Sequence, residues 1–396
     1  MLEFSSASTR SVSPVRAIDE LIETACGASA AQQSLVLINA GVGHDLGALS
    51  KRVREHCPDA RILGTSCAGI VGREGPGESL REVAVLCARG TGFTIAAAEG
   101  IFGKNSYECG EALARQLKSS PQPVKMVFLI ASGIDISNDR VIAGMEAVMG
   151  PEVTIFGGTS SDQMQGIATH QTVDGKVYQH SAFAVGFWEP SFTVDTQATH
   201  GFNAVGEPLV VTASDANRIL ELNGRPAWPH YLERLGLPPE SRLSDTIPVG
   251  ALAEELPADL AAEYGNPHIL RVVTKYGADG SLVYATDVAV GTKLWLTMRD
   301  EARIFADMDR MMQAMVARSG GRKPVVVFQA DCLARGRRLF DRVMKDELVQ
   351  RIQQPLAGPN GVPPWFGMYG FGEYARLGGQ NAYHNYTTAL AAIYAG

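Results

Sequence analysis

Short apolar runs alternate with amphipathic stretches in the first half of the chain. Residues 35–41 (LVLINAG) precede a stretch with apolar side chains at helical spacing over 46–53, and residues 61–66 (RILGTS) follow it. The same order returns over residues 127–160, which begin with VFLIASG and end with TIFGGTS. A strand-sized apolar run, a helical period and a second apolar run predict a β-α-β unit with parallel strands. The sequence therefore predicts an internal repeat.

Two further apolar runs follow each unit, and we expect them to pair as neighbouring strands. They cover residues 82–87 with 93–96 in the first unit and 182–187 with 192–195 in the second. Runs of this length and composition are typical of strands. The predicted fold class is α/β, with two mixed-sheet α/β modules built from repeated β-α-β-β-β units.

The pattern changes after residue 200. A strand is expected over 206–213, a turn-rich connection over 217–231, and a linker at the Pro-rich segment 237–241. Further strands are expected near 269–274, 282–287 and 386–394, with a helix over 302–318 that carries four methionines at helical spacing. Such a stripe is typical of core packing, and it also suits an adaptable pocket.

A third β-α-β unit is predicted from a strand over 325–330, a helix over 338–353 and a strand over 366–371. Gly370-Phe-Gly-Glu373 then stands where Gly-Thr-Ser stands at the ends of the first two units. In open α/β sheets, ligands bind beyond the carboxyl ends of the strands, where loops leave a crevice. We therefore expect a ligand to contact residues at these ends: Thr65, Ser66, Thr159 and Ser160.

Two acidic positions near these ends allow more than one interpretation. Asp162 suits recognition of an amine or guanidinium on a small ligand, and it equally suits capping of backbone N–H groups in a turn. Glu373 and His384 suit an acid-base pair, because a carboxylate raises the pKa of a neighbouring imidazole. The alternative is a hairpin in which Arg376 pairs with Glu373, while His384 and Asn385 bond the loop backbone or contact a ligand.

Cys332 follows a strand and precedes Arg335 and Arg337. Nearby guanidinium groups at a helix start lower the pKa of a thiol, which predicts either a nucleophile or a ligand contact by Cys332 and Arg335. The alternative is a small buried side chain in the core.

Composition narrows the class of protein. The chain has 396 residues, 45% hydrophobic and 19% charged, with a net charge of −7, which is typical of a globular protein and not of a nucleic-acid-binding one. The N-terminus has no apolar signal region, and no apolar run is long enough for a membrane span. The six scattered cysteines suit a reducing compartment, so a cytoplasmic location is expected.

Metal and nucleotide motifs are missing from the sequence. The eight histidines include no H-x-x-x-H spacing, which disfavours a metal hydrolase, and neither nucleotide-binding glycine motif occurs after a strand. A single axial histidine to haem leaves no spacing signature, so haem stays open at this point.

The chain resembles the FIST family (F-box and intracellular signal transduction), with both its N-terminal and C-terminal domains. Several motifs carry the resemblance in order: Ile62 to Gly69 (ILGTSCAG), Phe156 to Asp162 (FGGTSSD), His200 to Gly206 (HGFNAVG), Leu222 to Ala227 (LNGRPA), Phe328 to Arg335 (F-x-x-x-C-x-x-R), Gly370 to Glu373 (GFGE) and His384 to Thr387 (HNYT). The implied domains are an N-terminal extension over 1–30, a FIST N-terminal domain over 31–225 and a FIST C-terminal domain over 226–393.

The resemblance implies a non-enzymatic cytoplasmic sensor that binds a small ligand and acts on a separate signalling partner, a histidine kinase or a cyclic-di-GMP enzyme such as a diguanylate cyclase. The implied ligand is an amino acid or another metabolite. In the NosP-type subgroup it is nitric oxide on haem b, and the axial ligand here would be His200 or His170. Neither nucleic acid nor a membrane is an expected partner, and a homodimer is left open. An enzyme that uses Cys332 or the Glu373/His384 pair is the competing interpretation.

Overall fold

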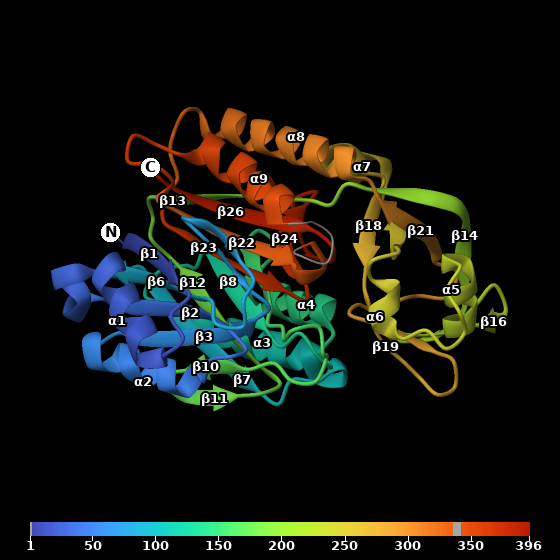
Figure 1. Cartoon of the computed structure of the whole chain (residues 1–396), viewed down its shortest axis with the longest axis horizontal. Coiled ribbons are helices and arrows are strands. Elements are labelled where there is room, and N and C mark those ends of the chain that lie inside the picture. The colour runs from blue at the N-terminus through green and yellow to red at the C-terminus, as the bar shows by residue number, and fades with distance from the viewer. Residues whose placement is uncertain (1, 336–341) are drawn as a thin grey trace.

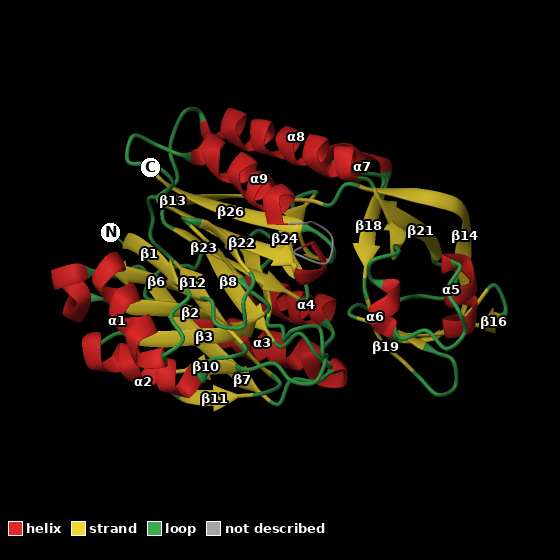
Figure 2. Cartoon of the chain, in the orientation of Figure 1, coloured by secondary structure: helices red, strands yellow, loops and turns green. Residues whose placement is uncertain are grey.

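The computed structural model describes residues 2–335 and 342–396. A larger body carries both termini, and a smaller unit projects from one side of it (Figure 1). Helices lie over the strands of the body (Figure 2). The predicted α/β class with mixed sheets and repeated units is confirmed. Within the described residues, no helix is both long and apolar enough to cross a membrane.

The body consists of three copies of one unit, each centred on a six-stranded sheet. The first copy contains β1 (Glu3–Thr9), α1 (Pro14–Ala25), β2 (Leu35–Gly41), α2 (Leu46–His56), β3 (Arg61–Cys67), β4 (Ile70–Gly72), β5 (Gly75–Gly77) and β6 (Val83–Arg89). The second contains β7 (Phe93–Glu99), α3 (Ser106–Leu117), β8 (Met126–Ala131), α4 (Asn138–Met149), β9 (Thr154–Thr159), β10 (Gln171–Val173), β11 (Lys176–Tyr178) and β12 (Ser181–Phe187). The third contains β13 (Phe192–Thr199), α8 (Glu301–Ser319), β22 (Val326–Cys332), α9 (Arg342–Gln353), β23 (Trp365–Gly370), β24 (Glu373–Leu377), β25 (Gln380–His384) and β26 (Thr388–Ala395).

The third predicted β-α-β unit is confirmed, because β22 and β23 pair in parallel on either side of α9 in the chain. The expected pairing of 82–87 with 93–96 is wrong, since β6 lies between β1 and β2 while β7 pairs with β12. The pairing of 182–187 with 192–195 is wrong in the same way, since β13 pairs with β26. Each of these strand pairs straddles the boundary between two copies, and apolar periodicity does not mark that boundary.

Each hairpin leaves its own copy and extends the sheet of another. β4 pairs with β23, β10 pairs with β3, and β24 pairs with β9. The inner faces of the three sheets share one apolar core, in which the ring centroids of Phe128 and Phe328 lie 4.8 Å apart. Helices cover the outer faces, so the central strands are buried on both sides and read as continuous apolar runs.

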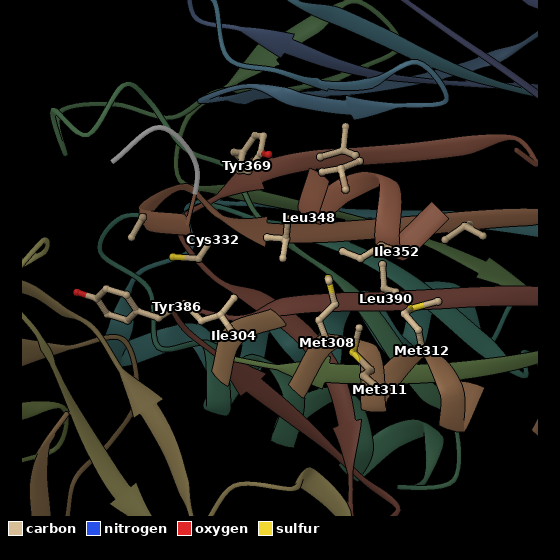
Figure 3. Close-up of a cluster of buried hydrophobic side chains, with 14 of the residues drawn as sticks. Ile304, Met308, Met311, Met312, Cys332, Leu348, Ile352, Tyr369, Tyr386 and Leu390 are labelled. Atoms are coloured by element: carbon tan, nitrogen blue, oxygen red, sulfur yellow. The ribbon is translucent and has the colours of Figure 1, made fainter. Parts of the chain in front are cut away.

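The methionine stripe of α8 belongs to this packing. The helix begins after Asp300, whose side chain accepts from the backbone N–H of Arg303, and ends at Gly320 in the left-handed conformation. Its buried face packs toward α9 and β22, as Figure 3 shows for Met308, Met311 and Met312. The core-packing interpretation of this stripe therefore applies.

The smaller unit is inserted into the third copy, between β13 and α8. It contains an eight-stranded sheet and three helices. Its elements are β14 (Phe202–Asp215), β15 (Arg218–Leu222), β16 (Arg225–Pro226), α5 (Ala227–Leu235), α6 (Leu243–Thr246), β17 (Ala251–Glu255), α7 (Ala258–Tyr264), β18 (His268–Arg271), β19 (Val273–Tyr276), β20 (Leu282–Tyr284) and β21 (Lys293–Arg299).

Two sequence expectations fail inside this unit. Residues 217–231 are not a turn-rich connection: they form β15, β16 and most of α5, because side chains such as Ile219 and Trp228 pack into the unit's own core. The Pro-rich segment 237–241 joins α5 to α6 within the unit and does not separate domains. The domain boundary predicted between residues 225 and 226 falls at β16.

Candidate functional site

The carboxyl ends of the parallel strands meet at one end of the body. Ser66 Oγ donates to the carbonyl of Ser161 at 3.1 Å and accepts from the backbone N–H of His170 at 3.0 Å. Ser160 Oγ donates to the carbonyl of Ala131 at 3.1 Å. All four predicted ligand contacts at these ends are buried among neighbouring strands: Thr65, Ser66, Thr159 and Ser160.

Ser161 links the second copy to both of the others. Its Oγ donates to the carbonyl of Tyr369 at 2.7 Å and accepts from the backbone N–H of Ala68 at 2.9 Å. Its own N–H donates to the carbonyl of Ser66 at 3.1 Å. We call residues 65–68, 159–161 and 369–372 the strand-end junction. The hydroxyl groups of this junction hold the three copies together.

A cavity of about 560 Å³ lies between this end of the body and the inserted unit. The body contributes the segments that follow β8, β9, β22 and β23, together with Tyr383 and Tyr386. The inserted unit contributes residues around α6 and β19. Among the predicted ligand contacts, Cys332 lines this cavity, and the other nine are not among its lining residues.

The cavity walls combine aromatic surface with a few charged groups. Phe371, Tyr383 and Tyr386 supply rings from the body. The Lys275 ammonium group, on the inserted unit, pairs with the Asp135 carboxylate, on the body. Arg242 adds a second cation to the lining. The site can therefore hold a molecule with an apolar part and ionised ends, because it offers both kinds of surface.

Asp162 shapes one wall without lining it. Its Oδ1 accepts from the backbone N–H groups of Gln165 and Gly166 at 2.8 and 3.1 Å, and its Oδ2 accepts from that of Ile167 at 2.9 Å. Asp162 therefore caps backbone N–H groups in a turn, which is the second of the two roles considered for it. Because Gln165 and Gly166 belong to the cavity wall, the carboxylate fixes the loop that faces the ligand space.

Asn385 and Arg271 bridge the body and the inserted unit. Asn385 Oδ1 accepts from the backbone N–H of Val272 at 3.1 Å, and its Nδ2 donates to the carbonyl of Phe371 at 3.2 Å. Arg271 donates to Glu254 within its own unit at 2.9 Å and to the carbonyl of Tyr383 in the body at 2.8 Å. Both residues therefore set the position of the cavity walls.

Glu373 and His384 stand opposite each other on β24 and β25, yet both are fully buried. Burial, with the nearby Asp331 carboxylate, raises the pKa of Glu373 well above its usual range. Burial, with the Arg271 charge, lowers the pKa of His384 to about 3. Both shifts favour the uncharged forms, and His384 Nδ1 lies 3.3 Å from the hydroxyl of Tyr264. This geometry does not favour the acid-base pair.

The hairpin interpretation of this segment holds in part. Gly378 and Gly379 have left-handed φ values of 62° and 72°, as a tight turn requires. Arg376, however, does not pair with Glu373. Its guanidinium donates to the carbonyl of Glu152 at 2.8 Å. Among the described residues, neither carboxyl oxygen of Glu373 has a hydrogen-bond partner.

Cys332 lines the cavity with a buried thiol. Burial, with the neighbouring Glu373, raises its pKa well above the usual range. Arg335 turns toward Asp331, with 3.2 Å between Nε and Oδ1, and its Nη1 donates to the carbonyl of His200 at 2.8 Å. Arg337 lies outside the described residues. The arrangement therefore disfavours a nucleophilic thiolate and leaves Cys332 as a lining residue.

Of the two histidines considered for haem, His200 does not fit an axial ligand, and His170 lies outside the cavity. His200 Nε2 lies 2.8 Å from the carbonyl of His268, and its Nδ1 accepts from the backbone N–H of Phe202 at 2.9 Å. Both ring nitrogens are therefore engaged, and burial lowers the pKa of His200 to about 3. His170 is half-buried beside β10, with its Nε2 2.9 Å from Gln179, and does not line the cavity. Within the described residues, no group of three or more His, Cys, Asp or Glu is placed to hold a metal ion.

Comparison with known families and structures adds an independent finding. The sequence matches the FIST N domain over residues 34–225 and the FIST C domain over residues 227–376. The chain belongs to the FIST family. FIST domains are associated with sensing in signal transduction, and FIST sensor domains bind small ligands.

Two mycobacterial relatives of this FIST protein are described as uncharacterized proteins. Protein Mb0898c of Mycobacterium bovis is 30% identical over 199 residues, which cover 49% of this chain and 48% of that protein. Rv0628c of Mycobacterium tuberculosis is 28% identical over 248 residues, 61% of each chain. The matches thus span about half to three fifths of these relatives. A solved cyanuric acid hydrolase from A. caulinodans aligns over 100% of this chain and 99% of its own, at 9% identity and a TM-score of 0.38, which is too low to support an inference.

Both FIST matches contribute to the cavity. The N-terminal match supplies residues 133–135 and 164–166 of the walls. The C-terminal match supplies residues 242–244, 247, 272–276, 332–334 and 371. Sequence reasoning missed Asp135, Lys275 and Arg242, because single charged residues carry no spacing pattern that points to a ligand. Tyr383 and Tyr386 lie on either side of His384 and Asn385, both of which were named as candidates from the sequence. Two aromatic residues this close to polar candidates were the signal that could have identified them.

Proposed function

We propose that this FIST protein senses a small organic molecule in the cavity between its body and its inserted unit, and that a separate signalling partner reads the bound state. The carrying observation is a cavity of about 560 Å³ whose walls come from both FIST domain matches. A ligand that contacts both walls favours the arrangement in which they are correctly spaced, and it shifts the population by its difference in affinity.

The lining supports an amino acid or a related metabolite as the ligand. Arg242 and Lys275 suit a carboxylate, Asp135 suits an ammonium group, and the rings of Phe371 and Tyr386 suit an apolar side chain. Haem is not part of this proposal, because both ring nitrogens of His200 are already engaged. Haem ligated by His200 would give a stoichiometric Soret band in the wild type that is lost in the His200→Ala variant. Titration with haemin is expected not to show this difference.

A metabolite library that includes the standard amino acids tests the proposal by thermal shift, with calorimetry on the compounds that raise Tm. Met164→Trp fills part of the cavity and is expected to weaken binding at least tenfold. Met298→Trp places the same ring on an exposed strand position and is expected to leave binding unchanged. A ligand whose affinity is the same in both variants binds elsewhere and contradicts this site.

The partner is proposed to be a histidine kinase or a cyclic-di-GMP enzyme. Its activity is expected to change on addition of the protein, and to change further when the identified ligand is present. Equal activity with and without ligand contradicts the sensing function, even where the ligand binds.

A further inference from the structure

Three cysteines that are distant in sequence converge on the outer face of the first sheet. Cys26 caps the C-terminal end of α1, Cys57 caps that of α2, and Cys87 lies on β6 opposite Ser5 of β1. The Cys87 thiol is hydrogen-bonded to Cys26, and Ser5 is also hydrogen-bonded to Cys26. The cluster is separate from the ligand cavity, because no residue of the first copy lines that cavity.

The three thiols differ in access to solvent. Cys26 is half-buried, whereas Cys57 and Cys87 are fully buried in the core beneath α1 and α2. The hydrogen bond from Cys87 lowers the pKa of Cys26, and the same contact raises the pKa of Cys87. Burial raises the pKa of Cys57 to about 11. A half-buried thiol with a lowered pKa, in contact with a buried thiol, is the arrangement of an attacking and a resolving cysteine.

We propose that Cys26 and Cys87 form an oxidation site, at which a hydroperoxide converts the two thiols into a disulfide. The Cys26 thiolate attacks one peroxide oxygen, the O–O bond breaks, and the leaving oxygen takes up a proton, which leaves a sulfenic acid on Cys26. The Cys87 sulfur then attacks the Cys26 sulfur. The S–S bond forms, the S–O bond breaks, and hydroxide leaves with the Cys87 proton as water. With hydrogen peroxide, two thiols are oxidised and one peroxide is reduced to two waters.

The proposal does not rest on the ligand-sensing function. The cross-link joins the end of α1 to β6, so it fixes the helix that covers the first sheet without touching the cavity. The site responds to oxidant chemistry and not to the proposed metabolite. Ligand affinity is therefore expected to be the same before and after oxidation.

Peptide mass spectrometry of the full-length protein tests the site after treatment with hydrogen peroxide and alkylation of the remaining thiols. The expected product is a linked pair of peptides that contain Cys26 and Cys87, with Cys57 still alkylated after denaturation. The C26S variant is expected to lose the cross-link. The C87A variant is expected to hold a sulfenic acid on Cys26 that dimedone captures. A linkage of Cys26 to Cys57, or oxidation without any disulfide, overturns the assignment.

Cys109 provides a matched control within the same chain. It is also half-buried, but it lies on α3 without a second thiol, and burial with the Glu108 charge raises its pKa. Iodoacetamide at neutral pH is expected to modify Cys26 at least tenfold faster than Cys109 in the native protein. Equal rates would contradict a reactive Cys26, and this measurement holds even where the C87A variant fails to fold.

Discussion

The strand-end junction and the cavity occupy the same end of the body, but only one of them leaves space. At the junction, Ser161 bonds backbone groups of the first and third copies, so exchanged hairpins and hydroxyl groups fill the region between the strand ends. At the cavity, the inserted unit faces the strand ends across a gap of about 560 Å³. The rule that ligands bind at carboxyl ends of strands points to the end of the sheets at which the cavity lies. Which residues line the space depends on what packs over those ends.

The largest expected difference is in the free energy of unfolding, when a serine is replaced at the junction and at the cavity wall. Ser161→Val removes the buried hydroxyl that bonds Ala68 N–H and the Tyr369 carbonyl, two groups that still bond each other at 3.0 Å. Each lost hydrogen bond is worth about 0.5–1.5 kcal/mol, so we expect a loss of about 1–3 kcal/mol in the free energy of unfolding. Ser244→Val, at an exposed position of the cavity wall, is expected to change it by less than about 0.5 kcal/mol. Urea unfolding of both variants measures the contrast, and equal losses would contradict it.

A second prediction concerns the buried Glu373 and the pH dependence of the free energy of unfolding. Burial raises the pKa of Glu373, so the folded protein keeps a proton that the unfolded chain releases above its ordinary pKa. Unfolding then releases a proton, and this residue's contribution to stability falls as pH rises, by up to about 1.4 kcal/mol per pH unit. Glu373→Gln removes that dependence and keeps the shape of the side chain.

Urea unfolding between pH 5 and pH 8 compares this variant with the wild type. The difference in the free energy of unfolding is expected to shift progressively in favour of Glu373→Gln as pH rises. Glu263→Gln, at an exposed position, is the control and is expected to show no such trend. A constant difference across the range would mean that Glu373 is ionised in the folded protein.

The repeat was predictable from sequence because its inner strands are covered on both sides. LVLINAG and VFLIASG read as apolar throughout, and the helices between the strands keep their own period, so two β-α-β units and a third could be placed. The exchange of hairpins was not predictable. Ile70, Thr172 and Glu373 pair with strands of other copies, and an alternating pattern does not specify which edge a strand joins.

The candidate site was predicted only in part, because the sequence does not show which distant segments pack against each other. Cys332 was identified because it follows a strand, and it lines the cavity. Asp162 and Asn385 were identified as polar residues in turns, and both act on wall segments through backbone hydrogen bonds. Lys275 and Asp135 were missed, because they are partners of each other across the two units and lie 140 positions apart in the chain.

A third prediction separates bonds across the two units from bonds within one. Asn385→Ala removes the hydrogen bonds to Val272 N–H and the Phe371 carbonyl, which we expect to cost about 1–3 kcal/mol. Asn381→Ala removes bonds inside the body, to Ile155 N–H and the Val153 carbonyl, at a similar cost. Hydrogen exchange is expected to speed up at residues 272–276 in Asn385→Ala and to stay unchanged there in Asn381→Ala. Equal exchange in both would mean that Asn385 does not hold the inserted unit.

The smallest expected effect is at the Lys275–Asp135 ion pair, which joins the two units beside the cavity, as the Arg140–Asp287 pair joins them elsewhere. Its side chains are 50% and 39% exposed, so water and salt screen the attraction. Lys275→Ala is accordingly expected to lower the free energy of unfolding by at most about 1 kcal/mol. The Lys176–Glu99 pair, 66% and 59% exposed, lies within the body, and Lys176→Ala provides the matched control.

Stability and local motion are expected to respond differently in these two lysine variants. Because Lys275 contacts the body from the inserted unit, its loss is expected to speed amide exchange at residues 272–276 in low salt, and 1 M salt is expected to abolish the difference from the wild type. Lys176→Ala is expected to leave that segment unchanged at both salt concentrations. A loss of more than about 2 kcal/mol in Lys275→Ala would show instead that the pair locks the two units together. The cavity would then have a fixed shape, and a ligand could not change the relative position of the two units.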